Sequence, residues 1–218
     1  MNPLIGGRAR RVVMKHLKMM LLGVLAGLAV LSGAQAVHAQ PTGTLVFDLK
    51  SYTSEAKMSK KQQTELEHAG VRWDMLDNNS LLISFVNERF VKADLKYLTR
   101  FGEKKSLELK AGRYTITCIG FEFNSTSRDV NKVLAKSAYF NNDVVTFAVQ
   151  PGKTTTLEVS PVYKPESQMR LWVKLTMLMP DLKVRVLEDG TPQGDDVVIN
   201  RRTDKSVAWN DYQGPLKF

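Results

Sequence analysis

The sequence predicts an all-β fold, mainly antiparallel, organised as a β-sandwich with one short inserted surface helix. From Gly43 onward, apolar residues recur at every second position, as at Leu45, Phe47 and Leu49, and this alternation is typical of strands with one buried face. Segments rich in glycine, proline, Asn and Asp separate the alternating runs, and these residue types favour tight turns. About ten short strands separated by such turns favour a sandwich or a barrel.

Residues 1–39 are predicted to be a signal peptide, followed by a mature chain that begins at Gln40. Five basic residues precede an uncharged apolar run over 19–33, which is shorter than the roughly 20 residues that a membrane helix needs. The segment 37–39 suits a signal peptidase, with cleavage after Ala39 or, as second choice, after Ala36. We therefore expect a periplasmic or secreted protein without a transmembrane span in its mature chain; an uncleaved anchor is the alternative.

The sequence leaves the export route and the start codon open. The stretch "ARRVVMK" resembles the twin-arginine export pattern at its arginine pair and its lysine, but it lacks the usual Ser and Phe. A start at Met14 would remove all three arginines, Arg8, Arg10 and Arg11, from the leader. We expect the general export route.

The net charge argues against nucleic acid as a partner. The chain has 31 Lys and Arg and 22 Asp and Glu, and the predicted leader holds five of the basic residues and none of the acidic ones. The mature chain therefore has 26 basic and 22 acidic residues, a net charge of +4. A surface of this balance lacks the dense basic patch that phosphate neutralisation requires.

Strands and helices are expected in a definite order along the mature chain. Alternating apolar sets predict strands around residues 45–49, 81–85, 107–109, 145–149, 157–159, 171–177, 184–186, 197–199 and 207–209. Residues 59–70 predict the inserted surface helix, because Ser59 can cap its start and Gly70 can end it. The segment 128–136 carries a less complete helical pattern. We expect one sandwich domain over 40–218, or a core over 43–163 with a C-terminal β extension over 164–218.

The turn segments "KAGR", "QPGK", "NNDV" and "EDGTPQGDD" predict antiparallel hairpins. We place Gly112 and Gly152 at positive φ in two of these turns. The stretches "LELKAGRYTIT" and "FAVQPGKTTTLEV" are also alike, each an alternating strand, a glycine with a basic residue after it, and a Thr-rich strand. Either the two stretches are similarly built hairpins of one sandwich, or their likeness is one that hairpins in general share.

The stretches "LKAGRYTIT" and "VQPGKTTTLEV" resemble the turn-strand signature of bacterial exported immunoglobulin-like and transthyretin-like β-sandwich domains. The resemblance covers residues 105–160. It implies a sandwich fold and a domain that binds or assembles rather than catalyses. The signature contains no functional residue, so none is assigned from it.

Cys118 is the one cysteine of the chain and shares a strand face with Tyr114 and Ile116. We expect it to be buried as a small hydrophobic side chain; an intermolecular disulfide and a reactive thiol are the alternatives. The following apolar residues, Ile119 and Phe121, have the opposite phase, which predicts a bulge or twist near Gly120. With one cysteine the chain forms no internal disulfide, so packing must stabilise it.

The sequence predicts neither a catalytic nor a metal site, and it implies no cofactor. His68 is the one histidine of the mature chain and lies in the predicted helix, away from any nucleophile motif. The acidic run "DGTPQGDD" misses the calcium-loop spacing and is read as a hairpin turn.

Three aromatic residues, Trp172, Trp209 and Tyr212, are the candidate ligand-binding residues. Trp172 is out of phase with Leu171 and Val173, so it lies either on a second buried face or on an exposed binding face. The favoured function is therefore an exported non-enzymatic β-sandwich protein that binds an envelope protein or glycan, its oligomeric state left open.

Two other functions are kept as alternatives. The first is an envelope enzyme that uses carboxylates, because two such acids need only meet in space. The second is a small outer-membrane β-barrel, because Tyr212, Leu216 and Phe218 are in step at the C-terminus.

Overall fold

The computed structural model describes residues 40–84, 95–122, 129–199 and 202–214. The chain divides into two compact units, 1–39 and 40–218, and the second unit holds all the described residues. The predicted signal peptide, the end of the strand expected over 81–85, and the C-terminal residues Leu216 and Phe218 lie outside the described residues.

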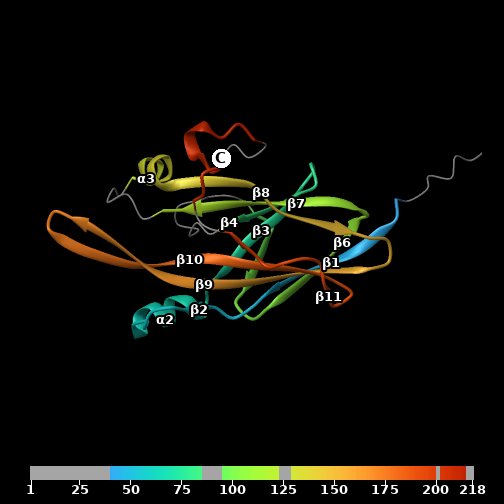
Figure 1. Ribbon diagram of the computed structural model, residues 1–218, viewed down its shortest axis with the longest axis horizontal. Helices are drawn as coiled ribbons and strands as arrows, with labels where there is room; N and C mark the ends of the chain where they lie inside the picture. Colours follow the sequence, from blue (N-terminus) through green and yellow to red (C-terminus); the bar gives the residue numbers. More distant parts are fainter. Residues whose placement is uncertain (1–39, 85–94, 123–128, 200–201, 215–218) are drawn as a thin grey trace, which may run out of the picture. The chain divides into compact units, whose positions relative to one another are not determined.

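The described residues form two β-sheets, which confirms the predicted mainly-β sandwich (Figure 1). The first sheet contains β1 (Thr42–Leu49), β2 (Thr53–Ser54), β6 (Lys104–Lys110), β9 (Thr154–Arg170), β10 (Val173–Glu188), β11 (Thr191–Pro192) and β12 (Val197–Ile199). Its order is β11-β10-β9-β1-β6, with β12 paired to β10 and β2 to β9. The second sheet contains β3 (Gly70–Leu76), β4 (Ser80–Ser84), β5 (Tyr97–Arg100), β7 (Gly112–Phe121), β8 (Ala138–Val149) and β13 (Val207–Ala208), in the order β13-β8-β7-β4-β3-β5.

Most strand pairs are antiparallel, as predicted, but three are parallel: β1 with β9, β2 with β9, and β4 with β7. Each parallel pair joins strands that are far apart in the sequence, because two parallel neighbours cannot be linked by a tight turn. β1 is thereby held between β9 on one side and β6 on the other.

The segments "KAGR" and "QPGK" are not hairpin turns, so this part of the prediction is wrong. β6 ends at Lys110 in the first sheet and β7 begins at Gly112 in the second, while β8 ends at Val149 in the second sheet and β9 begins at Thr154 in the first. Both segments therefore carry the chain from one sheet to the other. Gly152 has the predicted positive φ, +68°, but Gly112 is an ordinary strand residue.

Of the other two predicted turns, one is correct and one is wrong. In "EDGTPQGDD", Asp189 and Gly190 form the two-residue turn that joins β10 to β11. The segment "NNDV" instead lies inside β8. Ile116 lies opposite Val145 and Cys118 opposite Asn141, so β8 has three residues, 142–144, where β7 has one, and this is a bulge.

The main core lies between the two sheets and is built largely from the predicted alternating positions. Leu182 and the two residues of β3, Val71 and Trp73, are additions, because the sequence pattern predicts no strand at these positions. The first sheet contributes Leu45, Phe47, Leu49, Leu157, Val159, Leu182, Val184 and Ile199, and the second contributes Val71, Trp73, Leu81, Ile83, Tyr114, Ile116, Cys118, Val145, Phe147 and Val149. Trp73 is fully buried, stacks on Phe47 and on Tyr97 at centroid distances of 4.6 Å each, and donates a hydrogen bond of 2.8 Å to Thr99 Oγ1. Its one polar atom is thus satisfied inside the core.

A second cluster covers the other face of the second sheet, and it explains the change of phase after Cys118. Cys118 belongs to the main core, whereas Ile119 packs with Leu82, Leu134 and Phe140 in the second cluster. The bulge predicted near Gly120 is therefore wrong, because both phases of β7 are buried, each on its own face of the sheet. The bulge that does exist belongs to β8.

Two helices accompany the sheets. The predicted surface helix is α2 (Lys60–Glu67), and Ser59 caps it in a reciprocal arrangement with Gln62. The segment 128–136, with its less complete helical pattern, also contains a helix, α3 (Val130–Ser137). Asp129 caps α3 by accepting hydrogen bonds from the backbone of Asn131 and Lys132. The 3-10 helix η1 (Trp209–Asp211) follows β13, contacts α3 and contributes Trp209 to the second cluster.

Candidate functional site

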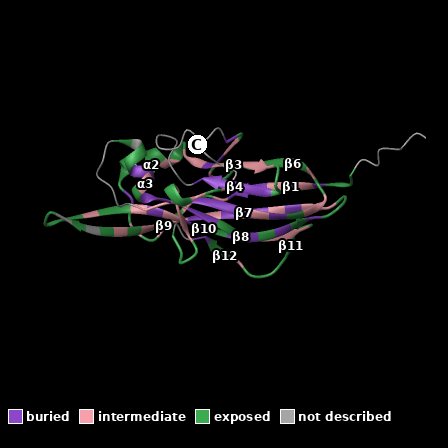
Figure 2. Cartoon of the chain, turned by 90° about the horizontal axis from the view of Figure 1, so that it is seen from above, coloured by how far each residue is buried: buried purple, intermediate pink, exposed green. Residues whose placement is uncertain are grey.

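β9 and β10 continue beyond the rest of the first sheet as a two-stranded ribbon. β9 pairs with β1 as far as Val159 and with β2 at Val162 and Tyr163. In the described structure, residues 164–170 then have β10 as their one strand neighbour. Figures 1 and 2 both show this ribbon projecting past the other strands, and the colours of Figure 2 mark exposed residues toward its end.

The ribbon ends in a two-residue turn, Leu171-Trp172, in place of the strand expected to start at Leu171. Arg170 and Val173 pair on either side of the turn, and Leu171 and Trp172 have φ values of +45° and +68°. Positive φ at both central residues is the arrangement of a type I′ turn, which strongly prefers Asn-Gly or Asp-Gly. A bulky side chain in this region is strained, at a cost of about 1–3 kcal/mol per residue.

Elsewhere in the described residues, positive φ is found at residue types that tolerate it. The turn from β10 to β11 has the same two-residue form and uses Asp189 and Gly190, at +46° and +83°. The other described non-glycine residues at positive φ are Asn79 and Asp143, which tolerate this region. Leu171 and Trp172 are therefore the exceptions among the described residues at positive φ, and their side chains do not favour the turn.

The turn and its flanks form an exposed apolar surface, which we call the apolar tip and define as Met169, Leu171, Trp172 and Val173. Their exposed fractions are 67%, 93%, 95% and 57%. The aromatic side chain of Trp172 thus lies almost wholly in solvent. These adjoining exposed apolar side chains make the apolar tip a candidate interaction surface.

Below the apolar tip the ribbon becomes polar and then joins the body of the sheet. Ser167 and Thr176 lie opposite each other and their hydroxyls are hydrogen-bonded at 2.7 Å. At the base, Met179 is buried and Lys164 forms an ion pair of 3.2 Å with Asp181. The ribbon is thus fixed at its base by packing and charge, and it ends in the exposed apolar tip.

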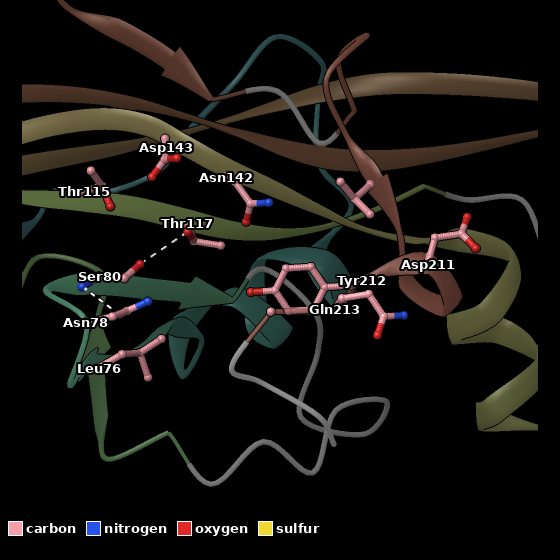
Figure 3. A pocket seen from close by; sticks show the side chains of 12 residues that line it. Leu76, Asn78, Ser80, Thr115, Thr117, Asn142, Asp143, Asp211, Tyr212 and Gln213 are labelled. Atoms are coloured by element: carbon pink, nitrogen blue, oxygen red, sulfur yellow. Dashed lines mark hydrogen bonds between the residues drawn. The ribbon is translucent and has the colours of Figure 1, made fainter.

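A polar groove of about 480 Å³ lies on the outer side of the second sheet, beside the second cluster (Figure 3). Its polar lining includes Asn78, Ser80, Thr117, Asn142, Asp143 and Asp211, and Tyr212 supplies an aromatic ring. Two hydrogen bonds order its floor: Asn78 Oδ1 accepts from the Ser80 amide at 3.2 Å, and the hydroxyls of Ser80 and Thr117 lie 3.3 Å apart. In Figure 3 the carboxylates of Asp143 and Asp211 lie at opposite ends of the groove.

The geometry of this groove depends on the bulge in β8 and on the C-terminal segment. Asp143 sits in the bulge with φ of +50°. Tyr212 stacks on Phe140 at a centroid distance of 3.6 Å, and Trp209 stacks on the same ring at 5.3 Å. Burial, and then the negative charge of Asp143, raise the pKa of Tyr212. The groove can offer hydrogen bonds to a polar ligand, but the aromatic ring that lines it, that of Tyr212, is engaged in packing on Phe140.

The three predicted binding residues therefore do not form one surface. Trp172 is at the apolar tip of the first sheet, while Trp209 and Tyr212 are half-buried in the second cluster. Sequence reasoning missed Met169, Leu171 and Val173 as members of the site. No sequence signal marks them, because the long alternating run from β9 into β10 contains no turn-forming residue at its midpoint.

Other residues considered from the sequence have structural roles. Cys118 is fully buried in the main core, and burial raises the pKa of its thiol well above the usual value. His68 is exposed at the C-cap of α2. Asp196 of the acidic run accepts two hydrogen bonds from Arg185, at 2.6 and 2.9 Å, and pairs with Lys183. Among the described residues, no group of three or more His, Cys, Asp or Glu is placed to hold a metal ion.

Comparisons with protein-family models, with curated proteins and with solved structures find no match to this chain. Within the described residues, no helix has the length and apolar character needed to cross a membrane.

Proposed function

We propose that this chain is an exported, non-enzymatic β-sandwich protein that binds a component of the cell envelope through the apolar tip of its β9–β10 ribbon. The observation that carries the proposal is the turn itself. Leu171 and Trp172 are strained at positive φ and over nine-tenths exposed, so they stabilise neither the turn nor the core. A contact with a binding partner gives their side chains a role.

The expectation of export supports the choice of an envelope component. The basic residues and short apolar run over 1–39 are typical of a secretory leader, so the partners that the mature chain meets are those of the periplasm or the exterior. The resemblance to exported binding and assembly domains points the same way.

The described side chains also favour binding over catalysis. The thiol of Cys118 is buried, and the two carboxylates of the polar groove lie at opposite ends. Hydrolysis by a carboxylate pair requires two such groups flanking one bond. The groove therefore supports the carboxylate-enzyme alternative less well than the apolar tip supports binding.

The test measures how much of the exported protein sediments with isolated bacterial envelope fragments. The informative variant is Leu171→Asn/Trp172→Gly, which supplies the preferred type I′ residues and removes the apolar side chains. Val198→Ser is the matched control, because Val198 is an exposed apolar residue, 49% exposed, on β12 rather than at the tip.

We expect the wild-type protein and Val198→Ser to sediment with the fragments, and the double variant to lose about tenfold or more in affinity, as is usual for the removal of an aromatic anchor. Equal binding by the double variant would overturn the proposal.

A further inference from the structure

We propose that the component bound by the apolar tip is an anionic lipid surface, into which the tip inserts as a wedge. This inference rests on the proposed function, because it names the partner of the same site. It is carried by the shape of the tip, by the order of side chains along the ribbon and by the charge of the segment.

The shape favours a lipid surface as the partner. The apolar side chains belong to the end of a two-stranded ribbon. Figure 1 shows this ribbon projecting past the other strands. Protein interfaces usually surround an apolar centre with a polar rim on a broad surface. A narrow projection that ends in Trp172 and Leu171 instead suits a fluid layer that closes around it, and tryptophan is enriched at the membrane–water interface.

The order of side chains along the ribbon sets a depth for insertion. The first pair after the turn is Arg170 with Val173, and three residues further the polar pair Ser167 and Thr176 follows. At about 3.3 Å per residue, this polar pair lies about 10 Å along the strands from the first pair. Apolar surfaces that lie in the membrane interface are buried by about 5–10 Å, so the Ser167–Thr176 pair falls at the level of the headgroups.

The charge of the segment favours anionic lipid. Residues 167–177 contain two basic residues and no acidic one, and Lys174, which is exposed, lies directly beside the apolar tip. The nearest acidic residue, Glu166, lies opposite Met177, beyond the polar pair. Basic residues close to a membrane surface add attraction to anionic headgroups, and a small apolar wedge needs such a second contribution to bind.

The experiment measures binding of the purified exported protein to vesicles of phosphatidylcholine alone and of phosphatidylcholine with about one third phosphatidylglycerol. Sedimentation gives the affinity, and tryptophan fluorescence reports insertion. The variants are again Leu171→Asn/Trp172→Gly and the control Val198→Ser, and Lys174→Gln tests the charge.

We expect the wild-type protein and the control to bind the anionic vesicles about tenfold more tightly than the neutral ones, with a blue shift of tryptophan emission and weaker binding at high salt. The double variant should lose both binding and the shift, and Lys174→Gln should lose several-fold in affinity. Failure of the wild-type protein to bind anionic vesicles, or equal binding by the double variant, would overturn the lipid proposal.

The two proposals fail in different ways. If sedimentation with envelope fragments depends on the apolar tip but is abolished by protease treatment of the fragments, and the vesicles are not bound, the partner is a protein. The proposed function then stands and the lipid inference is overturned. If the double variant sediments with the fragments as the wild type does, the proposed function itself is overturned.

Discussion

Cys118 shows how the environment of one residue decides its chemistry. Its side chain is fully buried between the sheets, and burial raises the pKa of the thiol, so the reactive thiolate is suppressed. We expect the thiol to resist alkylating reagents in the folded protein and to react once urea unfolds the chain, as followed by mass spectrometry. Rapid labelling of the folded protein would contradict its burial.

Replacement of Cys118 by serine should lower the free energy of unfolding by about 1–3 kcal/mol, because it places a hydroxyl in the apolar core. Urea denaturation measures the loss. Binding to envelope fragments should stay unchanged, since the residue is remote in sequence and sheet from the apolar tip.

Gly112 and Gly152 look alike in the sequence but should respond differently to substitution. Gly152 has φ of +68° and open space around it, so alanine there would meet backbone strain alone. Gly112 lies in β7, and a Cβ would make ordinary contacts of 3.8 Å with Asn79 and Tyr114. We expect Gly152→Ala to cost about 1–2 kcal/mol of unfolding free energy and Gly112→Ala to be neutral or slightly stabilising, as measured by thermal or urea unfolding.

At the scale of elements, a row of charges crosses the outer face of the first sheet. Asp48 of β1 lies opposite Lys104 of β6 and Glu158 of β9, and Lys50 bridges both acids at 2.8 Å each. The next strand adds Arg185, which lies opposite Glu158 and holds Asp196. The buried carboxylate of Asp48 is therefore neutralised by two basic side chains, Lys50 just after the end of its own strand and Lys104 on the neighbouring strand.

These contacts make stability depend on pH in the acid range. Burial acts to raise the pKa of Asp48, but hydrogen bonds from Lys104 and Lys50 outweigh it, so the pKa is lowered; hydrogen bonds from Arg185 and Lys183 hold the pKa of Asp196 far below its usual value. A carboxyl whose pKa is lower in the folded than in the unfolded protein stabilises the fold at pH values above its unfolded pKa, which is 3.8 for Asp. That stability is lost as the pH falls through the folded pKa.

We therefore expect the free energy of unfolding to be level above about pH 5 and to fall steadily toward pH 2. Asp48→Asn should be less stable at neutral pH and should show a shallower fall in acid, as measured by urea denaturation over a pH series. An unchanged acid slope in this variant would show that Asp48 is not a source of the dependence.

The second cluster joins α3, β8 and η1, and its aromatic residues should behave as core residues. Trp209 and Tyr212 both stack on Phe140. We expect Trp209→Ala or Tyr212→Ala to lower the free energy of unfolding by about 1–3 kcal/mol and Trp172→Ala to leave it almost unchanged, because Trp172 is 95% exposed. A large loss of stability in Trp172→Ala would assign that residue to the fold.

At the scale of the whole molecule, the sequence predicts which residues are buried better than it predicts how strands connect. Alternation correctly places Leu45, Phe47 and Cys118 in the core, because the two-residue period of a strand depends only on local geometry. The hairpins predicted at Gly112 and Gly152 are wrong, because a turn residue does not determine whether the next strand pairs beside the last one or packs across from it.

The candidate site was only partly predictable for a related reason. Trp172 stood out because it breaks the phase of its neighbours, but Leu171 was assigned to a strand because no turn-forming residue marks the end of the ribbon. The polar groove had no sequence signal, since its lining comes from segments as distant as Asn78, Asp143 and Asp211. Tertiary packing alone brings these residues together.

The central claim is that the side chains of Leu171 and Trp172 contribute to binding, whereas their positive φ angles destabilise the turn. The most direct test is the free energy of unfolding of Leu171→Asn/Trp172→Gly by urea denaturation, with Gly190→Trp, at φ of +83° in the β10–β11 turn, as the reverse control. We expect the double variant to be more stable than the wild type by about 1–3 kcal/mol, and the control to be less stable by a similar amount. A double variant that is less stable than the wild type by more than about 1 kcal/mol would show that the two side chains serve the fold, and would contradict the claim.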